Sequence, residues 1–141
     1  MGGCGRQITC VVRGELDHAR RVTIANLKIS KSEKLIDDIS ICHRVLGDLN
    51  ADLGRHDRAR RHYARALKIV RTISKRTVLL EALLARGRWA VRQGATEMAH
   101  NDLGEALSYA NTGGYRIYEV DIRVALAWTH RAAGNVAEAR L

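Results

Sequence analysis

Four glycines recur at a fixed interval of forty residues, and this register restricts the chain to a repeating fold. They are Gly14, Gly54, Gly94 and Gly134. Each is followed five residues later by an alanine and then by arginine or histidine, in the segments GELDHAR, GRHDRAR, GATEMAH and GNVAEAR. Self-similarity at a period of this length is typical of repeat architectures, in which every unit is one supersecondary structure.

Other positions keep the same period. A small residue precedes the last three glycines by seven positions, at Gly47, Gly87 and Ala127, and a leucine follows the first three at Leu27, Leu67 and Leu107. Because apolar residues recur at helical spacing between the glycines, each unit is predicted to hold two helices with the glycine in the tight turn that joins them. The absence of proline and the abundance of Ala, Leu, Arg and Ile also favour an all-α fold.

The register gives approximate bounds for these helices. Ser32, in the sequence SEKL, is expected to cap a first helix that ends at Leu53. Gly113 and Gly114 are expected to end a later one. The complete set of expected helices is 32–53, 56–73, 77–93, 96–111 and 115–133. The corresponding units are about 1–31, 32–75, 76–114 and 115–141, and the first and last are expected to be incomplete.

The alanines of the register indicate close helix packing. A small residue at a helix crossing lets the two axes approach, whereas a larger side chain would push them apart. Ala59 and Ala66 lie on either side of Tyr63 on one face of the helix expected over 56–73. We therefore expect these alanines at the contact with the preceding helix.

These features resemble the tetratricopeptide repeat family. The clearest unit is LGDLNADLGRHDRARRHYARAL, in which a leucine–glycine pair, a turn glycine, an alanine, an aromatic residue and a second alanine follow the family's order. The usual unit has 34 residues, and long units of this kind resemble those of bacterial signalling ATPases and transcription regulators. The resemblance implies a right-handed α-solenoid of antiparallel helix pairs, with about three to three and a half repeats, and a role as a protein-interaction scaffold within a larger signalling or regulatory protein.

The resemblance also implies a concave groove lined by the first helix of each unit. Carried over to this sequence, the groove residues are Arg44, Asp48, Leu84, Arg88, Arg92, Val124, Trp128 and Arg131. A large aromatic ring beside guanidinium groups suits a peptide or protein partner that carries carboxylates. Two simpler interpretations stay open, namely that Arg44 and Asp48 pair within their own helix and that Trp128 belongs to the core.

The positive charge is confined to one segment. Residues 55–76 contain nine of the 24 lysines and arginines and only one of the 15 acidic residues. On a helical projection Arg58, Arg61, Arg65 and Lys68 form a stripe opposite the apolar face. We expect a solvated outer face here, and the alternative is docking of nucleic acid or of an acidic partner.

Other chemistry receives little support from the sequence. Three cysteines without CxxC spacing and six histidines without helical i, i+4 partners predict neither a disulfide framework nor a metal site. No nucleophile motif or phosphate loop is present, so we expect no enzyme activity, no catalytic residues and no cofactor. No apolar run is long enough to span a bilayer. We expect a cytoplasmic protein that binds a protein or peptide partner and that self-associates through uncapped repeat ends.

Overall fold

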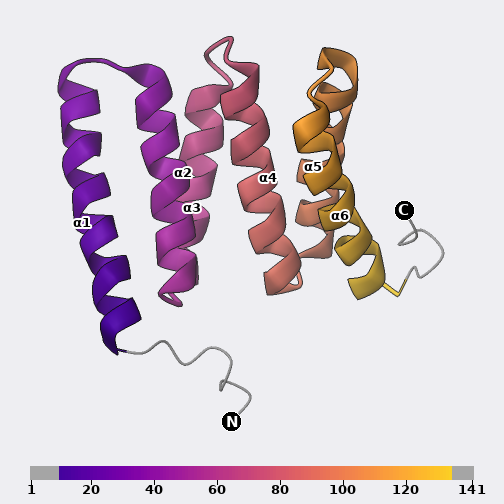
Figure 1. Cartoon of the computed structure of the whole chain (residues 1–141), viewed down its shortest axis with the longest axis horizontal. Helices are drawn as coiled ribbons and strands as arrows, with labels where there is room; N and C mark the ends of the chain where they lie inside the picture. The colour runs from indigo at the N-terminus through magenta and orange to yellow at the C-terminus, as the bar shows by residue number, and fades with distance from the viewer. Residues whose placement is uncertain (1–9, 135–141) are drawn as a thin grey trace.

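The computed structural model describes residues 10–134, and this part of the chain contains six α-helices and no β-strand. The predicted all-α class is confirmed. The helices are α1 (Cys10–Ser32), α2 (Ile36–Asp52), α3 (His56–Val70), α4 (Arg76–Gln93), α5 (Thr96–Gly113) and α6 (Arg116–Ala132). Figure 1 shows them as a row of rods in which consecutive helices run in opposite directions.

The helices form two layers. Each packs against the next along the chain, and in addition α2 packs against α4 and α4 against α6, whereas α3 and α5 make no close backbone contact with each other. Figure 1 shows α3 and α5 behind α2 and α6. Because helices α2, α4 and α6 are packed side by side while α3 and α5 are spread apart, the array curves with α2, α4 and α6 on its inner side. We call these three helices the inner layer.

Four of the turns share one way of ending a helix. A residue with positive φ follows the helix, and the next residue donates its backbone N–H to the carbonyl five positions earlier, as in a Schellman motif. Glycine adopts this left-handed conformation without steric cost, which explains why Gly54 and Gly94 recur at the turns. The four positive-φ residues are Lys34, Gly54, Gly94 and Gly114. Gly134, which follows α6, also has positive φ.

The predicted turn at Gly14 is wrong, because this glycine lies inside α1. A turn glycine is needed where one packed helix reverses onto another, whereas the described residues on both sides of Gly14 continue one helix, α1. Continuing the helix keeps the backbone groups of this segment hydrogen-bonded. The fourth copy's Ala139 lies outside the described residues.

Two predicted helix bounds also need correction. Ser32 is the last residue of α1 rather than the cap of α2, and its hydroxyl donates to the carbonyl of Ile29 at 3.1 Å. Helix α3 ends at Val70 instead of residue 73. There the hydroxyl of Thr72 donates to the carbonyl of Ile69 at 2.6 Å, a local hydrogen bond that competes with continuation of the helix.

Small residues do allow close helix contacts, as predicted. A Cβ atom built on Gly47 would lie 2.6 Å from the ring of Tyr63, and one on Gly87 would lie 2.7 Å from the side chain of Leu103. Tyr63 on α3 and Leu103 on α5 are fully buried, as are Ala59 and Ala66. The inner helix of each pair therefore presents a glycine to the large side chain of its partner.

Across the described residues, no helix combines the length and the apolar character that crossing a membrane requires.

Candidate partner-binding groove

Two pockets that share two lining residues lie on the inner layer, and we call them together the groove. One lies between α2 and α4, has a volume of about 370 Å³, and is lined by Arg44, Asp48, Asp52, Glu81, Leu84, Ala85, Arg88 and Arg92. The other lies between α4 and α6, also has a volume of about 370 Å³, and is lined by Arg88, Val91, Arg92, Asp121, Val124, Ala125 and Trp128. Arg88 and Arg92 border both pockets, so a bound segment could follow the groove from one into the other.

The structure brings seven of the eight predicted groove residues to these two pockets. They occupy the same register positions of successive inner helices, which places them in rows across the layer: Arg44, Leu84 and Val124 form one row, and Asp48, Arg88 and Trp128 another. The eighth, Arg131, does not line either pocket, but its guanidinium carbon lies 5.7 Å from the centre of the Trp128 ring. Their role in binding stays a prediction.

Trp128 is 57% exposed, so the interpretation that it belongs to the core is wrong. Val124, one helical turn before it, is also exposed, and both side chains face the pocket between α4 and α6. The other tryptophan, Trp89, is buried in the core against Tyr63. An indole ring left in solvent beside an exposed valine is an apolar contact surface that a partner would cover.

The charged side chains of the groove form long ion pairs. Arg44 lies 3.6 Å from Asp48, as the helix-pair interpretation predicts, and it also lies 3.8 Å from Glu81. Arg88 lies 3.7 Å from Asp121. Partly exposed pairs at such distances contribute roughly 0–1 kcal/mol each. These arginines could therefore exchange an internal carboxylate for one supplied by a partner at little cost.

Asp48 is also bound by a side chain of the neighbouring helix α3. The hydroxyl of the buried Tyr63 donates to Asp48 Oδ1 at 2.5 Å. Burial and this carboxylate raise the pKa of Tyr63 far above its usual value, so the phenol stays a hydrogen-bond donor. The hydrogen bond thereby connects Asp48, which lines the groove, to a residue of the hydrophobic core.

Sequence reasoning missed three acidic members of the groove, Asp52, Glu81 and Asp121. Glu81 and Asp121 are forty residues apart and so occupy the same register position of α4 and α6. Glu81 also accepts a hydrogen bond of 2.9 Å from the hydroxyl of Tyr118 on α6, which links two inner helices. This recurrence of acidic residues in the register was the signal that could have identified Glu81 and Asp121.

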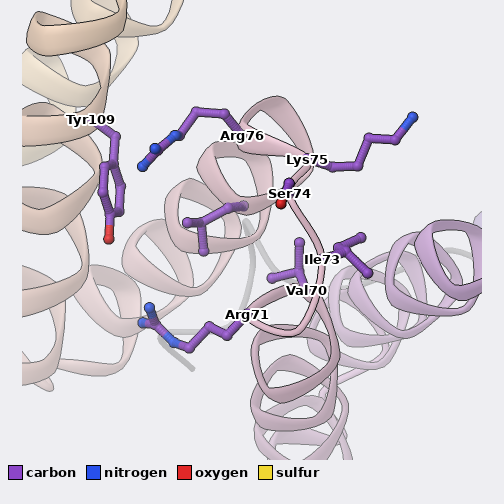
Figure 2. A pocket seen from close by; sticks show the side chains of 8 residues that line it. Val70, Arg71, Ile73, Ser74, Lys75, Arg76 and Tyr109 are labelled. Carbon is purple, nitrogen blue, oxygen red and sulfur yellow. The ribbon is translucent and has the colours of Figure 1, made fainter.

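A third pocket, of about 340 Å³, lies beside the connection between α3 and α4 (Figure 2). Arg71 and Arg76 point towards the helix that carries Tyr109, and Lys75 points away from it. Each of these cations already has a partner: Arg71 binds Glu105 at 2.7 Å, Lys75 lies 3.7 Å from Asp37, and Arg76 stacks over Tyr109 at 4.3 Å. We therefore do not assign this hollow as a binding site.

Two histidines meet on the other side of α2. Nδ1 of the buried His43 lies 3.1 Å from Nδ1 of His62 on α3, although the residues are 19 positions apart and no helical spacing predicted their contact. One of the two nitrogens must carry the hydrogen while the other accepts it, so the pair cannot be doubly protonated without losing this bond. Among the described residues, no group of three or more potential ligand side chains is arranged to hold a metal ion.

The histidine pair predicts that the fold loses stability in mild acid. Burial, together with the charges of His62, Lys31 and Arg65, lowers the pKa of His43 from 6.5 to about 4. Between about pH 4 and 6.5, His43 is therefore protonated in the unfolded chain but not in the folded chain. The stability that neutral His43 contributes is complete above pH 6.5 and is lost as the pH falls towards 4. Between pH 7.5 and 4.5 the free energy of unfolding is expected to fall by about 2 kcal/mol from this residue.

Urea unfolding across this pH range measures the effect. The variant His43→Leu should lose this part of the pH dependence, and the exposed His18→Asn control should keep it. Parallel curves for the wild type and His43→Leu would contradict the assignment.

The described fold agrees with one family of known proteins. Residues 39–112, just over half of the chain, match the family profile described as tetratricopeptide repeat. Antiparallel helix pairs with glycines at their crossings are the structure expected of such a profile, and the chain belongs to the tetratricopeptide repeat family. No significant match was found among curated proteins or among solved structures. Tetratricopeptide repeats generally mediate protein–protein interactions and are typically not enzymes.

Proposed function

We propose that this chain is a protein-interaction scaffold whose inner groove binds an extended or helical segment of a partner protein or of a longer parent chain. The single observation that carries the proposal is Trp128, exposed beside Val124 in the pocket between α4 and α6. In the proposal this ring is the apolar anchor, and the arginines around it orient the bound segment.

The charges of the groove favour a partner that presents carboxylates next to an apolar side chain. Arg92 borders both pockets and forms no ion pair with any described residue, and Arg88 is only weakly paired with Asp121. A guanidinium group can hold a carboxylate through two parallel hydrogen bonds, which fixes direction as well as affinity. The asparagines of the carboxylate clamp that chaperone cofactors use are missing from these positions, so a chaperone tail is not the partner we propose.

The proposal describes binding and not catalysis. The side chains that line the groove include no serine, threonine, cysteine, histidine or lysine, and three of its carboxylates, Asp48, Glu81 and Asp121, are paired with arginines. We place the protein in the cytoplasm, as part of a larger signalling or regulatory protein. The free thiols of Cys10 and Cys42 are compatible with a reducing compartment. Exposed apolar side chains on the terminal helices, such as Val11 and Ile117, support self-association.

A pull-down with the intact chain tests the groove. Trp128→Ala and Arg88→Glu should each weaken capture of the same partner, by about 30-fold for the tryptophan, as expected for a central hot spot worth about 2 kcal/mol. The matched controls are Val120→Ala and Arg123→Glu, which alter exposed side chains of α6 that do not line the groove. A partner retained by both groove variants, or lost equally with the controls, would refute the proposal.

A further inference from the structure

The outward side of α3 carries a row of cations without partners. Arg58, Arg61, Arg65 and Lys68 are all exposed, and within residues 10–134 none of them forms an ion pair. Acidic side chains form ion pairs with the arginines that flank the two ends of α3. Arg55 lies 3.9 Å from Asp17, and Arg71 lies 2.7 Å from Glu105. We call the four residues the basic stripe.

The fold does not require positive charge at these positions. Helix α5 occupies the corresponding place in the next pair and buries Ala99, Ala106 and, at the position of Tyr63, Leu103. Its residues at the four positions of the stripe, forty residues later, are Met98, Asn101, Glu105 and Ser108. In α1, by contrast, two of the equivalent positions carry the exposed residues Arg21 and Lys28. Solvation of an outer face therefore does not explain why, among α1, α3 and α5, only α3 carries cations at all four of these positions.

The stripe is straight and is not covered by a neighbouring helix. From residue 58 to residue 68 a helix rises about 15 Å. Helix α3 makes no close backbone contact with α1 or α5, and the four side chains of the stripe are exposed. A row of cations on an uncovered helix matches the rows of phosphates that border the major groove of B-form DNA, which is about 12 Å wide and accommodates a helix. The major groove of double-stranded RNA is too deep and narrow to accommodate a helix in this way.

We propose that the basic stripe binds the phosphate backbone of double-stranded DNA without reading its sequence. The surrounding surface argues against other anionic partners. No large apolar side chain of α3 is exposed, so the helix has nothing to insert into a lipid surface. Tyr63, the only tyrosine of α3, is buried, so no tyrosine ring on this face can stack on the bases of a single strand. Asp57, the one acidic residue of α3, lies in its first turn and leaves the rest of the row positive.

Salt-dependent binding to a short labelled duplex tests this directly. Four neutralised phosphates predict that the logarithm of the association constant falls with the logarithm of salt concentration with a slope of about −3.6, which is an affinity loss of about 150-fold between 50 and 200 mM salt. The variant Arg61→Gln/Arg65→Gln should reduce the magnitude of this slope by about 1.8. Replacing all four residues of the basic stripe by glutamine should abolish measurable binding. Circular dichroism confirms that each variant is folded.

The controls separate this surface from net charge and from the groove. Arg116→Gln/Arg123→Gln removes two exposed charges from α6 and should leave the affinity and slope unchanged. The stripe variants should still bind any groove partner, so failure of one proposal leaves the other standing. No binding at 50 mM salt, an unchanged slope in the fourfold variant, or equally tight binding of polyglutamate, double-stranded RNA or anionic vesicles would overturn the proposal.

Discussion

Replacing Asp102 with alanine is expected to destabilise the fold by about 3 kcal/mol, because it leaves a partly buried guanidinium group without its counter-ion. Asp102 on α5 is only 4% exposed. Its two oxygens accept hydrogen bonds from Nε and Nη2 of Arg86 on α4, at 2.6 and 2.8 Å. The arginine side chain is 21% exposed, so water can replace only part of the hydrogen bonding and charge compensation that the carboxylate provides.

The pair formed by Arg71 and Glu105 provides a matched control. It also has two hydrogen bonds, here from Nη1 and Nη2 of Arg71, at 2.7 and 2.9 Å, but its side chains are 44% and 30% exposed. Glu105→Ala is therefore expected to cost less than about 1 kcal/mol. Urea unfolding of both variants measures the difference, and equal losses would show that burial does not determine the strength of these pairs.

The register predicted the fold because it combines local and long-range information. Glycine at each turn is a local requirement, since Gly54 and Gly94 adopt a backbone conformation that other residues rarely take. A small residue such as Gly87, placed seven positions before the turn, reports the packing between two helices. Gly14 shows where this reasoning stops: it keeps the forty-residue register but lies inside α1, so a glycine at this spacing does not by itself create a turn.

The groove was predicted in the same way, from positions repeated on successive inner helices. What the sequence could not reveal are contacts between side chains of different helices. The meeting of His43 with His62 and the buried pair of Arg86 with Asp102 depend on how neighbouring helices are rotated and shifted along each other. Helical periodicity fixes which residues share a face but not which residue of the next helix they meet.

Replacing Gly87 with valine is expected to cost about 3 kcal/mol, because the added carbons would overlap a core side chain. A Cβ atom at this position lies 2.7 Å from both Cγ and Cδ2 of Leu103, and Leu103 is fully buried, so it has no free space to move into. Helices α4 and α5 would have to separate, which would weaken the contacts of the alanines around the leucine.

The matched control is Gly104→Val, one residue along α5 from Leu103. Gly104 is exposed, and a Cβ atom there would meet nothing within 4 Å. Valine has a somewhat higher helix propensity than glycine, so this variant should be as stable as the wild type or more stable by up to about 0.5 kcal/mol. Urea unfolding measures both, and a similar loss in the two variants would contradict the claim that the forty-residue glycine marks a helix crossing. If only Gly87→Val is destabilised, the glycine is needed at that position because the two helices meet there.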